Sequence, residues 1–306
     1  MSAVAVDRLR ALRQQAGIVT STSGTASTPA QAQAQAPMAM PLPALMRNTP
    51  PVGGTLVPTQ SDPTSALRRM LGIRERRTPG VALVARSHQR DLPGEVIADG
   101  LHLLERILPW DAMPSTLDGS FAREGELALA DLLFFDTETT GLAGGTGTRA
   151  FMIGASDFVP SGLRVRQLMM AHMAAESAML STFQTWLTPQ TRLVSYNGRC
   201  YDAPLLNTRY RLARRASPLP ELAHTDLLYP TRRRYRGVWE NCKLATIERR
   251  ALGIVREDDL PGSEAPAAWL GYLRGGSSHN LKRVLAHNFQ DVVTLARLLM
   301  HLAEPA

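Results

Sequence analysis

The chain has 306 residues, of which 44% are hydrophobic, and a formal net charge of +7 at pH 7. This length predicts one large or two modest domains, and the apolar content is enough for a substantial core. The positive charge favours an anionic partner, with nucleic acid as the first expectation. The two cysteines, Cys200 and Cys242, cannot build a disulfide framework or a structural zinc site by themselves, which fits a reducing cytoplasm.

The sequence lacks the signals of a membrane protein or a secreted protein. No run of about 18 apolar residues is present, so no membrane span is predicted. Arg8, Arg10 and Arg13 are not followed by the apolar segment of a signal peptide. We therefore expect a cytoplasmic protein without a membrane partner.

Residues 1–63 are predicted to form a low-complexity, mostly disordered tail. Residues 20–28 are rich in Ser and Thr, residues 31–36 alternate Gln and Ala, and prolines recur from Pro29 to Pro63. Such a stretch cannot bury enough apolar area to offset the entropy lost on ordering.

Residues 64–126 are predicted to form a basic lead-in segment that packs on the core. A short basic helix is expected over Ser65–Gly72. Further on, Pro93–Ile97 and Leu101–Leu108 suggest a turn and a small strand or helix. The arginines of this segment either meet phosphates or simply face solvent.

The main domain begins near Leu127, and its first strand ends in two acids. A continuous apolar run from Leu132 leads into Asp136 and Glu138, and Gly141 then opens a glycine-rich turn. Alternate side chains of a strand share a face, so the two carboxylates point the same way. Carboxylates this close repel one another unless a cation lies between them. The alternative is a core strand that turns polar where it meets solvent.

The patterns that follow predict a mixed α/β sheet. Ala150–Val159 and Leu163–Met170 are expected to be strands joined by a Pro-Ser-Gly turn. Apolar residues at helical spacing run from Met179 to Leu187, and Leu193–Tyr196 gives a fourth strand. Three strands in a meander, then helix, strand and helix, is the order of such a sheet.

Two further polar clusters follow in the chain. Asn197 and Asp202 come directly after the fourth strand, where Asp202 either caps the next helix or acts as a catalytic carboxylate. His287 and Asp291 lie four residues apart on one long helix predicted over His279–Leu299, and therefore on one face of it. Apolar neighbours on that helix indicate that at least one of the pair faces the protein.

Together these motifs resemble those of the DEDD exonucleases of the ribonuclease H-like superfamily. The motifs are Asp136-x-Glu138, Asn197-x-x-x-Tyr201-Asp202 and His287-x-x-x-Asp291. More narrowly, the chain is similar to the YprB-type ribonuclease H-like domain over about residues 65–303. The phrases that carry this likeness are Phe135–Leu142, Gly144–Gly147, Phe151–Gly154, Tyr196-Asn197 and His287-Asn288, together with Pro93–Glu95, Leu252-Gly253 and Asp259–Gly262.

The resemblance implies a fold and an activity. The fold would be an α/β, ribonuclease H-like mixed sheet, with three antiparallel strands and then parallel strands, flanked by helices, over residues 127–303. The activity would be 3′–5′ exonucleolytic hydrolysis of phosphodiester bonds by a two-metal-ion mechanism with Mg²⁺ or Mn²⁺. A non-catalytic nucleic-acid-binding module and a structure-specific endonuclease are the alternatives.

The resemblance also assigns roles to the polar residues. Asp136 would bridge both ions, Glu138 and Asp291 would hold the ion that carries the attacking water, and Asp202 would hold the other. His287 would be the general base or would position the water, since imidazole titrates near neutral pH. In the histidine class of these enzymes the His lies five residues before the last Asp, and in the tyrosine class the Tyr lies four before. His287 therefore combines histidine chemistry with the tyrosine spacing.

Substrate contacts are expected from polar, basic and aromatic side chains. Basic groups interleaved with aromatics suit single-stranded DNA or RNA, although a solvated basic face gives the same pattern. Asp258 and Asp259 are interpreted as loop acids without a metal. The candidate substrate-binding residues are Thr139, Asn197, Arg232, Arg233 and Tyr235.

Overall fold

The computed structural model of the protein describes residues 89–110, 114–141 and 146–304. The predicted tail and the predicted helix over Ser65–Gly72 lie outside the described residues. Within the described ranges, no helix combines the length and the apolar character needed to cross a bilayer.

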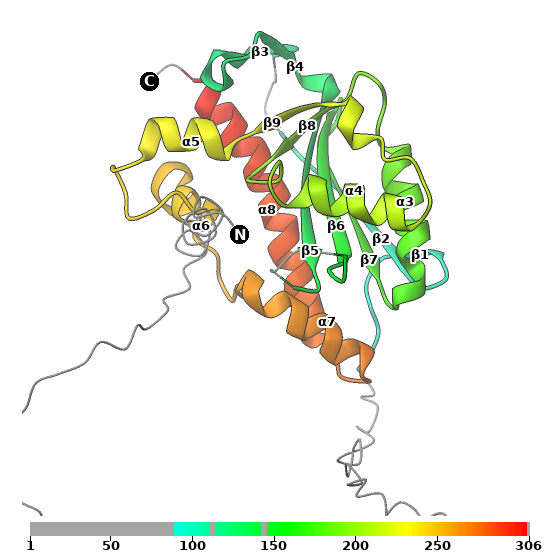
Figure 1. Cartoon of the computed structure of the whole chain (residues 1–306). Coiled ribbons are helices and arrows are strands. Elements are labelled where there is room, and N and C mark those ends of the chain that lie inside the picture. The colour runs from blue at the N-terminus through cyan, green and yellow to red at the C-terminus, as the bar shows by residue number, and fades with distance from the viewer. Residues whose placement is uncertain (1–88, 111–113, 142–145, 305–306) are drawn as a thin grey trace, which may run out of the picture. The chain divides into compact units, whose positions relative to one another are not determined.

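Seven strands form one mixed sheet in the order β1-β2-β7-β6-β5-β8-β9 (Figure 1). The first five strands of the sheet, β1-β2-β7-β6-β5, pair antiparallel. The last two strands pair parallel, β8 with β5 and β9 with β8. The predicted mixed α/β sheet is thereby confirmed. The strands are β1 (Glu95–Ala98), β2 (Leu101–Leu108), β5 (Leu132–Thr139), β6 (Ala150–Val159), β7 (Gly162–Met170), β8 (Arg192–Ser195) and β9 (Ala223–Asp226).

Strands β1 and β2 come from the segment that the sequence assigned to a lead-in. β2 pairs with β7 along its full length, with Leu101 opposite Met170 and Leu108 opposite Leu163. This part of the chain therefore extends the sheet by hydrogen bonding and does not pack on it as a separate layer. Between these strands and β5, a short two-stranded sheet is formed by β3 (Thr116–Asp118) and β4 (Glu126–Ala128).

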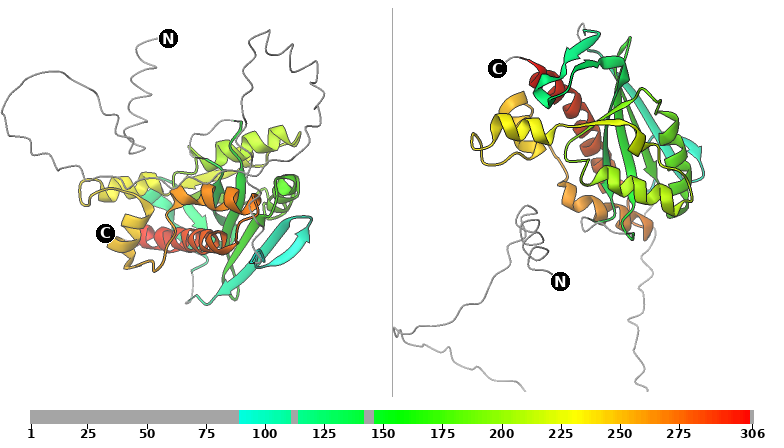
Figure 2. Two further views of the ribbon diagram at one scale, coloured as in Figure 1. Left: turned by 90° about the horizontal axis from the view of Figure 1, so that it is seen from below. Right: turned by 45° about the horizontal axis from the view of Figure 1, so that its top comes forward.

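Helices cover both faces of the large sheet. α3 and α4 lie on one face, whereas α8 crosses the other, as two viewing directions show (Figures 1 and 2). The long last helix predicted from the sequence is present, and it runs four residues further than Leu299. The helices are α3 (Glu176–Thr185), α4 (Asp202–Leu212), α5 (Leu228–Tyr235), α6 (Leu244–Ile247), α7 (Ala265–Leu273) and α8 (His279–Ala303).

The alternation of side chains along β5 divides the core between these two faces. Phe135 belongs to the apolar cluster that includes Phe183 of α3 and Leu206 of α4. Phe134 belongs to the second cluster, with Leu295 and Leu298 of α8. Because the side-chain period of a strand is two, the even-numbered residues that follow Phe134 also turn toward α8.

Candidate active site

Asp136 and Glu138 are the even-numbered residues at the end of β5, so their carboxylates face α8. There they meet the predicted pair His287 and Asp291. Glu138, His287 and Asp291 each offer one ligand atom within 4.8 Å of the others, the grouping that stands out as a possible metal site among the described residues. The Nε2 of His287 lies 3.4 Å from Oδ2 of Asp291, as the four-residue spacing on one helix face requires.

Asp202 reaches the same place from the other side of the sheet. It is the first residue of α4, and the hydroxyl of Thr137 on β5 donates a hydrogen bond to its Oδ1. The cap position is Tyr201, which makes no side-chain cap hydrogen bond. The structure therefore places Asp202 beside β5, where it faces the acids, and the interpretation of Asp202 as a helix cap is wrong.

The turn between β8 and α4 is shaped to bring Asp202 close. Asn197 has a φ of 67°, a left-handed conformation that asparagine tolerates better than most residues. At Gly198, an added Cβ would lie 2.5 Å from the Ser195 hydroxyl oxygen and 3.1 Å from Oδ2 of Asp202. Only glycine fits this approach, so the Asn-Gly pair of the sequence is what lets the turn close.

Asp226, at the end of β9, holds this turn in place. Its Oδ1 accepts a hydrogen bond from the backbone N–H of Asn197 at 2.7 Å, and its Oδ2 accepts one from Arg199 at 3.2 Å. A third backbone donor, the N–H of Leu228, lies 3.1 Å from Oδ1. Asp226 is thus a structural acid that positions Asp202 through the backbone of the turn.

Asp136 is oriented by an amide ladder across three strands and α8. Asn288 donates its Nδ2 hydrogen to Oδ2 of Asp136 at 3.1 Å, and its own Oδ1 accepts from Gln167 at 3.0 Å. Gly154 lies on β6 between Asp136 and Gln167, opposite both in register. A Cβ there would stand 2.0 Å from Oδ1 of Asn288, so the ladder requires glycine at this position.

The four carboxylates are close enough to perturb one another. Burial, reinforced by the charges of Asp291 and Asp202, raises the pKa values of both Asp136 and Glu138 well above their ordinary range. Burial likewise raises the pKa of Asp202 to about 6, and it also raises the pKa of Asp291 despite the opposing charges of His287 and Arg256.

Clustered carboxylates of this kind fit a divalent cation. A positive ion among them would offset both the burial of their charges and the repulsion between them, the causes that raise the pKa values of Asp136 and Glu138. All four offer oxygen, which Mg²⁺ and Mn²⁺ prefer, and no thiolate lies among them. The donor set therefore suits a hard divalent ion.

His287 has a second acid partner that the sequence analysis set aside. Its Nδ1 lies 2.7 Å from Oδ1 of Asp259, in the segment before α7. Asp259 is therefore more than the loop acid it was taken for, because it contacts the imidazole from the side opposite Asp291. The pattern alone gave no sign of this contact, since 28 residues separate the two positions.

Arg256 was also missed, and it lies in the middle of this network. Its guanidinium donates to both oxygens of Glu248, at 2.7 Å each, and to Oδ1 of Asp291. Glu248 opens a π-helical turn (Glu248–Leu252) that follows α6, and its carboxylate also accepts a hydrogen bond from the buried Thr294 of α8.

The predicted substrate-binding residues divide into two groups. Thr139 is the last residue of β5, and Asn197 lies in the turn after β8. The Thr139 hydroxyl donates a hydrogen bond to the carbonyl of Gly141 at 3.0 Å. Arg232 lies near Tyr196, whose pKa is raised by burial and lowered less strongly by the arginine charge. This position adjoins the same turn.

Arg233 and Tyr235 make contacts elsewhere. Arg233 donates to the backbone carbonyl of Phe121. Tyr235 stacks on Trp239 with ring centroids 4.3 Å apart, and its hydroxyl lies 2.6 Å from Nε2 of His301. His301 is ten residues beyond Asp291 on α8, about 15 Å along the helix at 1.5 Å per residue. Tyr235 therefore lies well away from the acids, whereas Arg233 lines a pocket that also includes Arg199 and Asp226.

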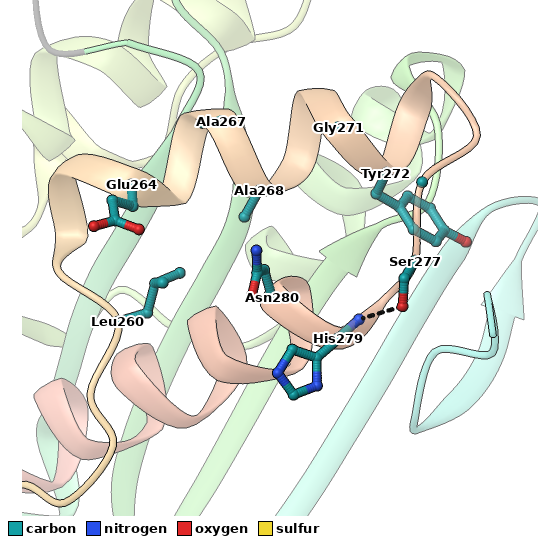
Figure 3. Close-up of a pocket in the computed structure, with 10 residues that line it drawn as sticks. Leu260, Glu264, Ala267, Ala268, Gly271, Tyr272, Ser277, His279 and Asn280 are labelled. Atoms are coloured by element: carbon teal, nitrogen blue, oxygen red, sulfur yellow. Dashed lines mark hydrogen bonds between the residues drawn. The ribbon is translucent and has the colours of Figure 1, made fainter. Parts of the chain in front are cut away.

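A cavity of about 450 Å³ lies between α7 and the first turn of α8, and none of the four acids lines it. Figure 3 shows Leu260 and Glu264 at one end and Tyr272 and Ser277 at the other. Its only carboxylate is Glu264, so the cavity does not share the donor set of the acid cluster.

The fold and the site define a member of the RNase H superfamily. A family model described as RNase_H superfamily matches residues 133–303, which span β5 to α8 and contain all four acids. The chain belongs to this superfamily, and its core is a nuclease fold.

An individual relative is the uncharacterized protein YprB of Bacillus subtilis (strain 168). The two are 37% identical over 175 residues, which cover 57% of this chain and 42% of YprB. The chain thus spans less than half the length of this relative. The YprB-type ribonuclease H-like domain predicted from the motifs is confirmed.

Solved structures that are similar to the chain include a polymerase and an exonuclease. The family B DNA polymerase of Pyrobaculum calidifontis is 15% identical with a TM-score of 0.43, covering 55% of this chain and 24% of the polymerase. A product-bound exonuclease I is 17% identical with a TM-score of 0.33, covering 51% and 46%. The family model and the strand order carry the fold assignment, since both TM-scores are low.

Proposed function

We propose that the chain is a metal-dependent 3′–5′ exonuclease that hydrolyses phosphodiester bonds of DNA or RNA. The convergence of four carboxylates from β5, α4 and α8 on one place supports this proposal. Their mutual repulsion and their oxygen donors suit a pair of Mg²⁺ or Mn²⁺ ions. When bound, such ions stabilise negative charge on the phosphate and on the leaving oxygen and lower the pKa of a water.

The acids have separate roles in this proposal. Asp136, which is near enough to feel the charges of the other three carboxylates, would help to hold both ions. Glu138 and Asp291 would hold one ion, and Asp202 would hold the other. Asn288 and Thr137, which donate to Asp136 and Asp202, fix the orientation of these two carboxylates.

His287 would accept a proton from the attacking water. Asp259 faces Nδ1 of the imidazole, and with the Nδ1 proton donated to that carboxylate the Nε2 lone pair is directed toward Asp291. An imidazole held in one tautomer by a carboxylate has the orientation that a general base needs.

The substrate would approach the carboxyl ends of β5 and β8. Thr139 and Asn197 lie at this edge, and Arg232 of α5 would contribute phosphate neutralisation. Tyr235 is a candidate only for a longer strand, because its contact with His301 lies toward the end of α8, and Arg233 is a candidate beside Arg199 and Asp226. A nucleic acid with a free single-stranded 3′ end is the proposed substrate.

The experiment is cleavage of end-labelled single-stranded DNA and RNA with Mn²⁺ or Mg²⁺, comparing the unsubstituted chain with Asp136→Ala. Stepwise shortening that stops when the 3′ hydroxyl is blocked would support the exonuclease. Internal cuts insensitive to the block would indicate a structure-specific endonuclease. Binding without cleavage would indicate a non-catalytic module and would contradict the proposal.

A matched control excludes a general effect of removing an acid. Asp99 lies in the turn between β1 and β2, with a side chain that is 98% exposed. Asp99→Ala is expected to cleave like the unsubstituted chain, whereas Asp136→Ala is expected to bind nucleic acid without cleaving it.

A further inference from the structure

Arg256 is the cation that lies within the acid cluster, and it is held on all sides. Its side chain is only 11% exposed. Its Nε donates to Oε2 of Glu248, and one terminal nitrogen donates to Oε1 of Glu248 and Oδ1 of Asp291. The other terminal nitrogen lies 3.0 Å from Nδ1 of His287 and 3.6 Å from Oδ2 of Asp259. The Nε and one terminal nitrogen thus donate to carboxylates, and the other terminal nitrogen lies against Asp259 and His287.

The partners of Arg256 come from three separate parts of the chain. Glu248 belongs to the π-helical turn after α6, Asp259 to the segment before α7, and Asp291 to α8. The planar fork of a guanidinium can bind several carboxylates in fixed directions, which an ammonium cannot do. Arg256 therefore fixes the positions of these three acids relative to one another.

The contact with Asp291 determines which oxygen of this carboxylate is free. Oδ1 is taken by Arg256, whereas Oδ2 lies toward Nε2 of His287. The carboxylate cannot rotate without breaking a charge-assisted hydrogen bond in a largely buried setting. A carboxylate oxygen of Asp291 and one of Glu138 lie within 4.8 Å of each other and of a His287 ring nitrogen, so the orientation of Asp291 bears directly on this grouping.

Charge alone does not account for this arrangement. Glu248 is 1% exposed at its side chain and balances the charge of Arg256, so the pair adds little net charge to the site. Arg249, in the same π-helical turn as Glu248, forms an ion pair with Glu240. This pair is about half exposed and includes none of the four acids. The Glu248–Arg256 pair differs by its direct link to Asp291.

We propose that Arg256, anchored by Glu248, is a positioning residue that sets Asp291 and the Asp259–His287 pair in the geometry that binds a divalent ion. This inference rests on the proposed function, and it names two residues outside the four acids on which that function depends. Residues that orient metal ligands in this way contribute about 10- to 100-fold to metal affinity.

The test is the affinity of the folded protein for Mn²⁺, measured by the decrease of free Mn²⁺ in an electron paramagnetic resonance titration without nucleic acid. Arg256→Gln is expected to weaken binding of one Mn²⁺ at least about tenfold. Arg249 lies next to Glu248 in the π-helical turn, and Arg249→Gln is expected to bind Mn²⁺ as tightly as the unsubstituted chain does. Arg256→Lys keeps the positive charge but loses the planar guanidinium, so this variant is also expected to bind Mn²⁺ weakly.

Whether Arg256→Gln binds Mn²⁺ more weakly or more tightly shows whether Arg256 positions the ligands or only repels the ions by its charge. If Arg256 only repelled the ions, Arg256→Gln would bind Mn²⁺ more tightly, and the proposal would be overturned. Full rescue by Arg256→Lys would also overturn it. If Arg256→Gln fails to fold because Glu248 is left buried and unpaired, the Glu248→Gln/Arg256→Gln double variant removes both charges. Native Mn²⁺ affinity in a folded double variant would contradict the proposal.

Cleavage assays separate this inference from the proposed function. If the unsubstituted chain binds Mn²⁺ and cleaves nucleic acid while Arg256→Gln matches it in both, only the inference fails. If the unsubstituted chain does not bind Mn²⁺, both fail. The expected result for Arg256→Gln is a lower kcat at saturating substrate with little change in KM, since Arg256 does not face the substrate.

Discussion

The Nδ1 atom of His287 lies 2.7 Å from Oδ1 of Asp259, while its Nε2 atom faces Oδ2 of Asp291 at 3.4 Å. The imidazole is therefore bound on both edges by acids from different parts of the chain. Asp259 is placed as the orienting acid of a catalytic pair would be, and Asp291 is one of the proposed metal ligands. This geometry fixes the orientation of the imidazole despite the four-residue spacing between His287 and Asp291.

We expect His287→Ala to lower kcat by about 100-fold or more, the contribution of a well-placed general base. Its affinity for Mn²⁺ should change less than about threefold if the imidazole is a base and not a ligand. Asp259→Asn should lower kcat by a smaller factor, because the imidazole stays but loses its orienting charge. Single-turnover cleavage and Mn²⁺ titration measure the two quantities.

The double variant His287→Ala/Asp259→Asn checks whether the acid acts through the imidazole. Its kcat should equal that of His287→Ala alone, since residues that act as a unit are not additive. A further loss in the double variant would show that Asp259 has a separate role.

We expect Asp136→Asn to have opposite effects on stability and on activity. The substitution removes one charge from a group of repelling carboxylates, so the melting temperature of the metal-free protein should rise. Metal-dependent cleavage should fall by at least about a thousandfold, corresponding to several kcal/mol of lost transition-state stabilisation. Thermal unfolding in EDTA and cleavage rates with Mn²⁺ measure the two effects, with Asp99→Asn as the control. A lower melting temperature in EDTA would contradict the repulsion inferred from the raised pKa values.

The contribution of the acid cluster to the stability of the metal-free protein should fall as the pH rises. Burial raises the pKa of Asp202 from 3.8 to about 6, so the folded state binds this proton more tightly than the unfolded chain does. Stability is therefore lost between about pH 4 and pH 6 and stays lower above pH 6, by on the order of 3 kcal/mol. Asp136 and Glu138 shift in the same direction and reinforce the trend.

Thermal unfolding at pH 5, 6 and 7.5, with EDTA or with Mn²⁺, measures this dependence. Mn²⁺ binds the ionised carboxylates, so it should raise the melting temperature more at pH 7.5 than at pH 5. Asp202→Asn should flatten the curve recorded in EDTA. A metal-free curve with the same slope in Asp202→Asn would show that this carboxyl does not carry the effect.

We expect Gly154→Ala to lower both the folding stability and the Mn²⁺ affinity, although Gly154 is not itself a proposed ligand. The added methyl would collide with Oδ1 of Asn288, which is 2.0 Å from the Cβ position, and would push Asn288 away from Asp136. Overpacking of this kind costs about 1–3 kcal/mol of folding stability. The Mn²⁺ affinity should fall as well, since Asp136 loses the donor that orients it.

Gly271→Ala is the matched control for Gly154→Ala. A Cβ at Gly271 meets nothing within 4 Å, and the residue lies inside α7. Alanine there should be neutral or should stabilise the protein by up to about 1 kcal/mol, because alanine favours helix. Equal effects of the two substitutions on urea unfolding would contradict the proposed collision.

Local patterns in the sequence were sufficient to predict most elements of the core. The apolar run into Asp136 predicted β5, and the Pro-Ser-Gly turn predicted the hairpin of β6 and β7. The place of β2 could not be predicted in the same way. Its partner β7 lies far along the chain, and hydrophobic periodicity reports which face is buried but not which strand lies alongside. Strands that the sequence assigned to a lead-in therefore belong to the sheet.

The sequence by itself determined which acids share a face, because the period of a strand and the period of a helix are fixed by backbone geometry. That reasoning placed Asp136 with Glu138, and His287 with Asp291. The resemblance of the motifs added Asp202, for which the residues alone left a helix cap as the alternative, and only the tertiary structure showed the contacts of Asp259 and Arg256 with His287 and Asp291. These contacts depend on how α4, α8 and the segment after α6 pack on the sheet, and packing joins residues whose separation along the chain carries no periodic signal.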